Sequence, residues 1–431
     1  MSQVNNTTEL SIHLGGPLSG INDLEDVIRQ LEEDLPRAMA RALEEHQEEM
    51  VAAVVGHRHQ RTPGIKQVIC PRCGGTHFHR GNLQQVGILT SKGKIRFNKF
   101  GLRCDDCGRT IFPFAPAVGR HRATAKVEEV CVDLATRMSY REAAQVIKLT
   151  WNLEIPHEDI HALVQRHGTA MQLPQAGRGE VQVLMLDSTK APAGKKSRGT
   201  DVFLAVGLTD RQLLDGRPAV GKLPVALVVS DSRQRWEQVL SDLNPSLVLT
   251  DDDPYLVDLV HRLFPHAVHQ LRLFHFPRTL GNMLWKDGVA KEGRLPHIEK
   301  LRHILYLDPL PWAEERLQLM QVRFRRKGWT NAAGLLQRAQ NRLLAFREHP
   351  DRTLQPARPH TGWGHLATSV IERQMREINA RSEIGCHWSI QGLEHLLRLR
   401  IVRRLCPRQW SSYWAAFRRS DDAQTSLPSA A

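Results

Sequence analysis

The sequence lacks any long hydrophobic run. No stretch of the 431 residues approaches the roughly 20 apolar residues in a row that a membrane-spanning helix needs. The opening residues, MSQVNNTTELSIHLGG, also lack the basic and apolar regions of a signal peptide. These two features predict a cytoplasmic protein without a membrane-spanning helix.

Acidic residues are too few to balance the basic ones. The chain has 46 Asp and Glu against 59 Lys and Arg, which gives a formal net charge of +13. Such an excess favours a polyanionic partner; nucleic acid is the first candidate and an anionic membrane surface the alternative. The hydrophobic content of 41% is that of an ordinary globular protein, and the length suits roughly two to four domains.

Cysteine is also scarce. The seven cysteines are an odd number, and four of them form two C-x-x-C pairs, CPRCG at residues 70–74 and CDDCG at residues 104–108. In a reducing compartment this pattern indicates metal binding rather than disulfides. Each pair can direct two thiolates at one ion, and the glycine that follows permits the turn that such a knuckle requires.

We therefore predict that Cys70, Cys73, Cys104 and Cys107 bind a structural Zn²⁺ ion, since four thiolates complete its tetrahedral shell. Between the pairs, VGILTSKGKIRFNKFGLRC alternates like a β-hairpin with its basic residues on one side. Together these features predict a zinc ribbon over residues 63–118. A redox-active pair is the alternative. The other cysteines are expected to be buried packing residues: Cys131, Cys386 and Cys406.

Residues 1–62 are predicted to form an N-terminal helical segment. Within it, residues 22–54 carry apolar side chains at spacings of three and four, which is typical of an amphipathic helix. We expect this helix to pack on the rest of the fold. A dimerising helix is the alternative, because enzymes that rearrange DNA often work in pairs.

Residues 119–176 contain three helical stretches. The second of them begins with a capping-box pattern, Ser139 followed by Glu142, and the third runs over about residues 157–171. Three tandem helices in a basic protein predict a helix-turn-helix DNA-binding domain, whose third helix would enter a major groove. A plain helical linker bundle is the alternative. The expected exposed reading residues are His161, Gln165, Arg166 and His167.

The pattern changes to α/β after residue 176. Apolar runs predict strands over residues 181–186, 201–208, 223–230, 247–249 and 267–274. The order is three strands, a helix, a strand, a helix and a strand. Functional groups collect at the carboxyl ends of strands in open α/β sheets. Two of the runs lead directly into carboxylates, Asp187 after the first and Asp251 after the fourth.

A third candidate carboxylate, Glu372, lies on a late helix in the segment TSVIER. Acids from two strand ends and one helix can hold two Mg²⁺ ions about 4 Å apart for an in-line displacement at phosphorus. The neighbouring Asp252 and Asp253 are expected to lie in a solvated loop. A surface glutamate paired with Arg376 is the ordinary alternative for Glu372. Its competitors for the third position are Glu377, Glu383 and Glu394.

These segments carry a family resemblance. LMLDSTK around Asp187, LVLTDDDPYLVDLVHRLFP followed by AVHQLRLFH, and TSVIERQMREINARS around Glu372 resemble a bacterial insertion-sequence transposase of the DDE type, near the Mutator-like superfamily. The paired C-x-x-C region and the helix beginning SYREAA are similar to the DNA-end-binding region of such enzymes. The resemblance covers roughly residues 66–415.

The resemblance implies an α/β multidomain protein whose RNase H-like catalytic domain, residues 177–415, contains an all-helical insertion at about 276–366. It implies Mg²⁺ or Mn²⁺ at Asp187, Asp251 and Glu372, and strand cleavage and strand transfer as the chemistry. The implied partners are double-stranded DNA, as terminal inverted repeats and target, and further copies of the chain in a homodimer or higher oligomer. The implied location is the nucleoid of a bacterial cytoplasm.

The histidine of the segment LRLFH, His275, matches a family histidine that the resemblance places in the active site. The family often has cysteine or aspartate three residues earlier, whereas this chain has Arg272. From the residues alone, His269 and His275 are equally well explained as partly buried, neutral histidines.

Arginines follow Glu372 closely. Arg373 and Arg376 are expected to contact DNA phosphates. A solvated helix face explains part of a larger group that consists of Arg381, Arg398, Arg400, Arg403 and Arg404. Beyond them, residues 416–431 are polar and are expected to form a disordered tail.

Three other functions stay open at this point. A catalytically inactive descendant would act as a DNA-binding regulator. An RNase H-like nuclease or Holliday-junction resolvase would hydrolyse DNA without joining it. A zinc-dependent hydrolase would use His and Asp residues instead of three acids.

Overall fold

The computed structural model describes residues 21–56, 68–115, 123–175, 181–194, 199–212, 218–230, 232–349, 369–384 and 387–425. The chain is mixed α/β, as predicted, and its strands form two separate sheets. It divides into two compact units. The first comprises Met1–Val164 with Trp410–Ala431, and the second comprises Gln165–Gln409.

A long helix and a β-hairpin begin the first unit. The hairpin is antiparallel and adds one short third strand. In its second strand Lys94 and Arg96 are exposed, whereas Ile95 and Phe97 are buried against the helix. This alternation confirms the predicted hairpin with basic residues on one side. The elements are α1 (Ile21–Gly56), β1 (Phe78–Thr90), β2 (Gly93–Cys104) and β3 (Thr110–Ile111).

Three helices follow the hairpin, as the sequence predicts. The predicted capping box is present: the Ser139 hydroxyl accepts from the Glu142 backbone N–H at 3.1 Å, and the Glu142 carboxylate accepts from the Ser139 backbone N–H at 2.9 Å. Cys131 is fully buried, which confirms its packing role. The helices are α2 (Ala125–Ala135), α3 (Tyr140–Trp151) and α4 (His157–Ala170).

The predicted disordered tail over residues 416–431 is wrong for its first part. Helix α14 spans Pro407–Thr425, and residues 426–431 lie outside the described residues. Trp410, Trp414 and Phe417 recur at helical spacing, and Trp414 is fully buried. This aromatic stripe gives the helix an apolar face, which outweighs the polar residues around it. Cys406, just before the helix, is only partly buried.

A five-stranded sheet organises the second unit, in the order β6-β5-β4-β7-β8. β4, β5 and β6 are antiparallel neighbours, and β7 and β8 extend the sheet from β4 in parallel. The predicted order of strands and helices is confirmed. The strands are β4 (Val183–Ala191), β5 (Thr200–Gln212), β6 (Pro218–Ser230), β7 (Leu247–Thr250) and β8 (Val268–Leu271).

β4, β5 and β6 are longer than the hydrophobic runs that predict them, whereas β8 (Val268–Leu271) is shorter than the predicted strand over residues 267–274. β4 continues through Asp187 to Ala191, so the prediction that it ends at Asp187 is wrong. β5 and β6 likewise extend to Gln212 and from Pro218, into the predicted loop between them. Antiparallel backbone pairing continues where the side chains are no longer apolar, and the residue pattern does not report it.

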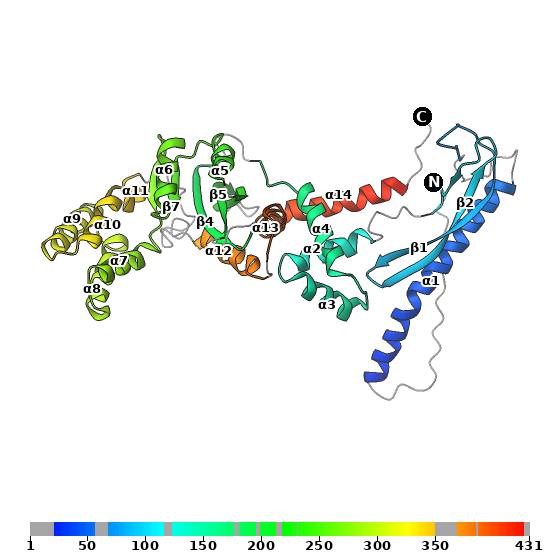
Figure 1. Ribbon diagram of the computed structural model, residues 1–431, viewed down its shortest axis with the longest axis horizontal. Coiled ribbons are helices and arrows are strands. Elements are labelled where there is room, and N and C mark those ends of the chain that lie inside the picture. Colours follow the sequence, from blue (N-terminus) through cyan, green and yellow to red (C-terminus); the bar gives the residue numbers. More distant parts are fainter. Residues whose placement is uncertain are drawn as a thin grey trace. The chain divides into compact units, whose positions relative to one another are not determined.

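Two layers of helices enclose this sheet (Figure 1). Along β4, Val183 and Met185 face one hydrophobic cluster, whereas Leu184 and Leu186 face the other. Helices α5 (Arg233–Leu240) and α6 (Pro254–Leu263) cover the second face. Helices α12 (Ser369–Ser382) and α13 (Ile390–Leu405) pack on the first. Both faces of the central strands are therefore shielded from solvent.

A run of helices separates β8 from α12, as predicted for the insertion at 276–366. The described part of it, up to residue 349, is entirely helical, and residues 350–368 lie outside the described residues. Its apolar side chains join the core of the first sheet face. Among the residues that the structure describes, no helix is both long and apolar enough to cross a membrane. The helices are α7 (Phe276–Lys286), α8 (Lys291–Tyr306), α9 (Leu310–Arg326), α10 (Thr330–Leu343) and α11 (Ala345–Glu348).

Candidate functional site

Three neighbouring strands bring two acids and one arginine to the same level. The parallel register of β4 with β7 and of β7 with β8 places Asp187, Asp251 and Arg272 side by side where β7 and β8 end. Asp187 follows the alternation of Val183 and Met185, so its side chain points to the sheet face that α12 covers. The sheet register therefore brings together residues that are far apart in the chain.

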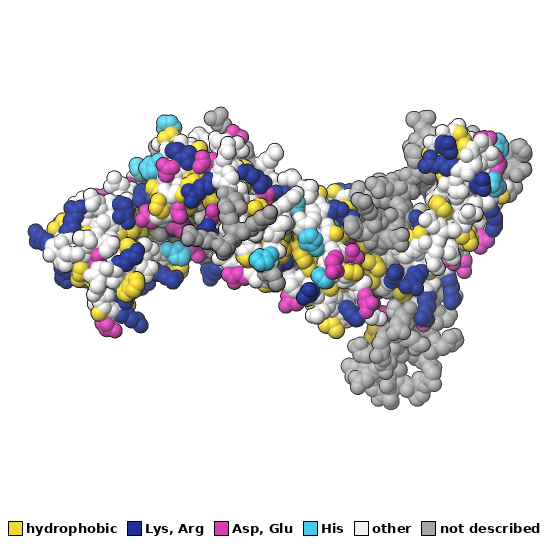
Figure 2. All heavy atoms as spheres, viewed as in Figure 1, with side chains coloured by type: hydrophobic (Ala, Val, Ile, Leu, Met, Phe, Trp, Pro, Cys, Tyr) yellow, Lys and Arg dark blue, Asp and Glu magenta, His cyan; other side chains and the backbone are white. Residues whose placement is uncertain are grey.

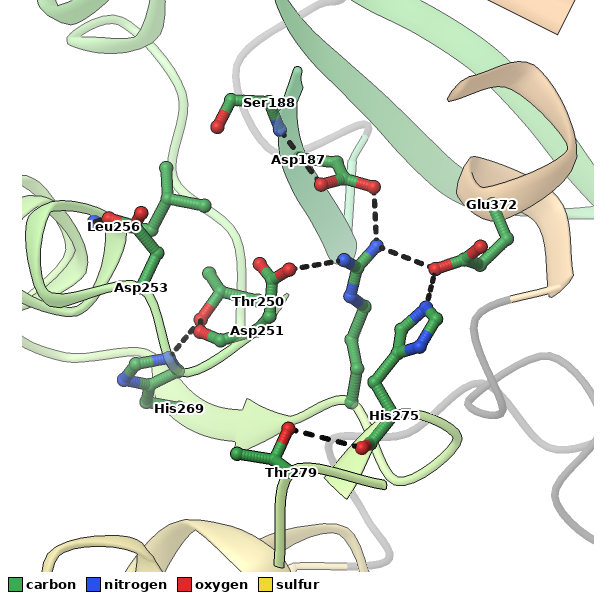
Figure 3. Close-up of polar contacts among 11 residues, drawn as sticks. Asp187, Ser188, Thr250, Asp251, Asp253, Leu256, His269, His275, Thr279 and Glu372 are labelled. Atoms are coloured by element: carbon green, nitrogen blue, oxygen red, sulfur yellow. Dashed lines mark hydrogen bonds and ion pairs between the residues drawn. The ribbon is translucent and has the colours of Figure 1, made fainter. Parts of the chain in front are cut away.

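Arg272 links the two acids (Figure 3). Its Nη1 donates to Asp187 Oδ2 at 2.6 Å, and its Nη2 donates to Asp251 Oδ2 at 2.7 Å. The Arg272 side chain is only 2% exposed, and that of Asp187 is 8% exposed, but that of Asp251 is 40% exposed. Among these three side chains, that of Asp251 is the most open to solvent.

The third predicted acid also reaches this cluster. Glu372 lies in the first turn of α12, next to Ile371, which is buried in the core of the first sheet face. Its Oε1 is 3.7 Å from Arg272 Nη1 and accepts a short hydrogen bond from His275 Nε2. His275 is the N-cap residue of α7. The structure therefore brings Asp187, Asp251, Glu372 and His275 together around one guanidinium.

Burial and the neighbouring Arg272 shift the pKa of Asp187 in opposite directions. Desolvation raises the pKa of Asp187 to about 6, and the charge of Asp251 adds to that rise, although Arg272 opposes it. Burial alone would lower the pKa of Arg272, but the carboxylates of Asp187 and Asp251 more than reverse this and raise it. The guanidinium therefore offsets part of the rise in the pKa of Asp187 that desolvation causes.

The donor set suits a hard divalent cation. Three carboxylates from two strands and a helix face one positive charge, and carboxylate oxygen is the ligand that Mg²⁺ and Mn²⁺ prefer. The ligand atoms of the three acids do not all lie within 4.8 Å of one another, a distance that only the four paired cysteines satisfy in the described part of the chain. The Arg272 guanidinium bonds Asp187 and Asp251 and lies 3.7 Å from Glu372, so it stands among the three acids.

A hydrogen-bonded pair beneath the cluster fixes the end of β7. The Thr250 hydroxyl donates to the Asp251 carbonyl at 2.7 Å, and His269 Nε2 lies 2.8 Å from the same hydroxyl oxygen. Because the hydroxyl hydrogen is already used, Nε2 must carry the donated hydrogen and Nδ1 is unprotonated. Burial, with the charges of Arg342 and His261, lowers the pKa of His269 to about 3. His269 is therefore a buried, neutral histidine, which is one of the two interpretations that the sequence leaves open.

The other acids of the DDD segment have structural partners. Asp253 is the N-cap of α6 and accepts from the backbone N–H groups of Tyr255 and Leu256. Asp252 accepts from Arg342 at 3.1 Å and is largely shielded from solvent. The predicted solvated loop is confirmed for Asp253, which is exposed, whereas Asp252 is partly shielded because the helical insertion supplies Arg342.

Two competitors of Glu372 also have structural partners. Glu394 is buried and accepts from Arg235 at 2.7 Å through each oxygen, and from Arg398 at 2.8 Å. Glu377 pairs with Arg400 and with Arg404, the latter at 2.7 Å. Neither carboxylate reaches the acid cluster. Glu383 is exposed beyond α12.

These pairs decide which arginines are open to a ligand. Arg373 and Arg376 are exposed on α12, as predicted. Several other arginines of the group are paired within the protein. Arg381 is buried and donates to the Ile384 carbonyl, and carboxylates hold Arg398, Arg400 and Arg404.

The predicted reading residues of α4 are exposed only in part. His161 is exposed and makes an edge contact with Tyr140. Gln165 is half-buried and bonds His395 at 2.8 Å, Arg166 is half-buried, and His167 is fully buried. The prediction of exposure is therefore wrong for these three. The end of α4 packs closely on α13, since Gly168 leaves no room for a Cβ beside His395.

The four paired cysteines meet as predicted. Cys70 Sγ is 3.6 Å from Cys107 Sγ, Cys73 Sγ is 3.5 Å from Cys104 Sγ, and all four sulfurs lie within 4.8 Å of one another. This group could hold a metal ion such as zinc. Backbone N–H groups of Arg72 and Cys73 point at the Cys70 sulfur and lower its pKa to about 6.

The predicted role of the glycines is confirmed. Gly74 and Gly108, each directly after a pair, have φ of +75° and +69°. The two knuckles are built alike, because Gly74 N–H donates to the Cys70 carbonyl at 2.9 Å and Gly108 N–H donates to the Cys104 carbonyl at 3.0 Å. A side chain at either glycine would strain the turn.

Arg272, Thr250 and His269 are the site residues that sequence reasoning did not assign. Arg272 was visible only as a basic residue in a position where the resembling family has an acid or a cysteine. The signal that could place it is the register, because parallel alignment of β4, β7 and β8 sets Asp187, Asp251 and Arg272 at matching positions. No family model matches the chain, and no curated protein matches it either.

Proposed function

We propose that this chain is a DDE-type DNA transposase with an RNase H-like catalytic domain. The meeting of Asp187, Asp251 and Glu372 around one positive charge carries the proposal. The strand order, with three antiparallel strands followed by two parallel ones, and the helical insertion before Glu372 support the fold assignment. Two-metal phosphoryl chemistry uses a set of carboxylates such as this one to hold its pair of ions.

Asp187, Asp251 and Glu372 would hold the divalent ions. When bound, these ions activate the attacking oxygen and stabilise the leaving oxygen at phosphorus. His275 orients the Glu372 carboxylate through their hydrogen bond. Thr250 and His269 hold the backbone of Asp251 in place. Arg373 and Arg376, exposed on the same helix as Glu372, would contact the DNA backbone.

The first unit would bind the ends of the element. In this proposal the four cysteines form a zinc ribbon around a structural Zn²⁺ ion, and helices α2–α4 form a helix-turn-helix. His161 is the exposed residue of α4 that remains as a base-reading candidate. The partners are terminal inverted repeats, target DNA and further copies of the chain, in the cytoplasm of a bacterial cell.

Cleavage of DNA that carries the repeats flanking the gene tests the proposal. With Mg²⁺ or Mn²⁺, the full-length protein should nick at the repeat ends and join pre-cleaved ends to target DNA. Asp187→Asn and Asp251→Asn should each abolish both reactions while end binding stays within a few-fold of wild type. Cleavage that persists in either variant would show that the triad is misassigned. Cleavage without joining would identify a nuclease or resolvase instead.

One observation favours a second candidate, the inactive DNA-binding regulator. Arg272 occupies the place between the carboxylates where a metal would bind, so a permanent guanidinium there would exclude metal chemistry. End binding without any metal-dependent cleavage would identify this function. The zinc-hydrolase alternative has no such support, since the metal-capable group among the described residues contains cysteines alone.

A further inference from the structure

Arg272 differs from the other buried ion pairs of this unit. Around Glu394, two arginines and a backbone N–H satisfy a single carboxylate. Around Arg272 the acids outnumber the bases. One guanidinium faces three carboxylates and holds direct hydrogen bonds to only two of them. One positive charge leaves this group of acids with excess negative charge, which a second cation or a doubly charged one would neutralise better.

The Arg272 side chain is also incompletely satisfied. Its Nε is buried and has no hydrogen-bond partner among the described residues. A buried N–H without an acceptor costs free energy, typically about 1–3 kcal/mol. A permanent structural bridge would be expected to use this donor. The guanidinium is therefore held by its charge rather than by a complete set of hydrogen bonds.

Solvent reaches the three acids mainly at Asp251, one of the two acids to which Arg272 is hydrogen-bonded. The Asp251 side chain is 40% exposed, against 8% for Asp187 and 16% for Glu372. An ion that arrives from solvent meets the Asp251 oxygens first, where it competes with Nη2 of Arg272. The guanidinium cannot surrender its charge, since arginine stays protonated in proteins. It can only move away from the acids.

We propose that Arg272 is a resident cation that competes with the divalent metal for Asp187 and Asp251. It occupies the place between the two acids in the metal-free protein, and metal loading requires its withdrawal. This inference rests on the proposed function in one respect, because it takes the same three acids to be a divalent-cation site. It assigns Arg272 as a positioning residue that sets the metal affinity of that site.

Mn²⁺ binding to the zinc-loaded, full-length protein without DNA tests the competition. Arg272→Gln removes the charge and keeps a donor, so it should bind Mn²⁺ at least about tenfold tighter, the low end of what close charge pairs contribute. Arg272→Lys keeps a competing charge and should stay within about threefold of wild type. Titration calorimetry or the free-Mn²⁺ resonance signal measures the affinity. Arg342→Gln is the matched control, because Arg342 pairs with the adjacent Asp252 and should leave the affinity unchanged.

Thermal unfolding with and without Mn²⁺ gives a second test, which applies even if Arg272→Gln folds poorly. The metal-free Arg272→Gln protein should melt below wild type, since its acids repel one another, and Mn²⁺ should raise its Tm far more than that of wild type. Adding Asp187→Asn should remove both gains. The inference is overturned if Arg272→Gln binds Mn²⁺ no tighter, if the gain survives Asp187→Asn, or if the variant stays unfolded with Mn²⁺ present.

The two proposals can fail separately. Tighter Mn²⁺ binding by Arg272→Gln with no DNA cleavage by any variant supports the competition and contradicts the transposase. Metal-dependent cleavage by wild type together with unchanged Mn²⁺ affinity in Arg272→Gln supports the transposase and contradicts the competition.

Discussion

His269 makes the end of β7 sensitive to pH. Its Nε2 donates to Thr250, which in turn fixes the Asp251 carbonyl. A second proton would have to enter at Nδ1, which is buried without a partner among the described residues. Burial is the main reason that the pKa of His269 falls from 6.5 to about 3. The neutral ring is therefore part of what holds Asp251 in position.

The stability that His269 contributes should decrease as the pH is lowered. Because the folded pKa lies below the ordinary value, this contribution is fully present above pH 6.5 and is lost as the pH falls from 6.5 towards 3. The loss is up to about 1.4 kcal/mol of unfolding free energy for each pH unit in that window. Urea unfolding of wild type and His269→Gln between pH 7 and pH 4 measures it. The two curves should converge as the pH falls, and a constant separation would contradict the assignment.

The sequence predicts the acids of the site well, but it does not predict the role of the neighbouring Arg272. Asp187 and Asp251 stand out because carboxylates directly follow buried apolar runs. Glu372 has no such local signal, and only the resemblance separates it from Glu377. The role of Arg272 depends on how β7 and β8 are aligned, and a one-dimensional pattern contains no register.

The four-cysteine site joins secondary-structure elements, because its ligands lie at the start and at the end of the hairpin. We expect about one zinc ion for each wild-type chain. Cys70→Ser should lose that zinc and expose the β1–β2 hairpin to proteolysis, since metal binding stabilises such small folds. Elemental analysis and limited proteolysis measure the two effects. Cys131→Ser, which alters a buried cysteine in α2 outside the site, should retain the zinc. A metal-free wild-type protein would contradict the assignment.

A buried ion pair ties α13 to the edge of the sheet. Glu394 accepts from Arg235, from Arg398 and from the Val229 backbone N–H. Glu394→Gln removes the charge that two guanidiniums share and should cost about 3–5 kcal/mol of unfolding free energy. Urea unfolding measures this cost. Glu377→Gln is the control, because Glu377 is 29% exposed and its loss should cost about 1 kcal/mol or less. Equal losses would show that burial does not set the difference.

Element types follow from the sequence more reliably than their ends. Strand order and helix periodicity give most of the second unit. The misjudged tail is instructive, because residues 416–425 belong to α14 although they are polar. Two of the three aromatic side chains of its apolar face, Trp410 and Trp414, lie before that segment, and Phe417 lies at its start. Helical structure then continues past its apolar anchor at little cost in free energy.

Positive charge is spread over the whole molecule. On the face that Figure 2 shows, Lys and Arg side chains occur over the helical insertion, over the sheet and over the hairpin. The formal net charge of +13 attracts a polyanion from any direction. Affinity alone therefore says little about which surface binds DNA, and the salt dependence of binding is the more informative quantity.

The salt dependence of DNA binding tests whether α12 contacts the DNA backbone. If Arg373 and Arg376 each contact a phosphate, replacing both with Gln should lower the slope of log K against log salt concentration by about 2, since each contact contributes roughly 0.9. Binding should weaken similarly for all DNA sequences, because phosphate contacts carry no base information. Fluorescence anisotropy between 50 and 200 mM salt, about the range in which such contacts are resolved, measures the slope.

The control removes the same charge from the opposite side of the sheet. Arg233 and Arg262 belong to α5 and α6, which cover the face away from α12. Arg262 is already paired with Glu237 and Asp258. Replacing both with Gln should change the slope by much less than replacing Arg373 and Arg376. Equal changes in the two double variants would mean that net charge governs binding and that α12 is not the DNA-contacting helix.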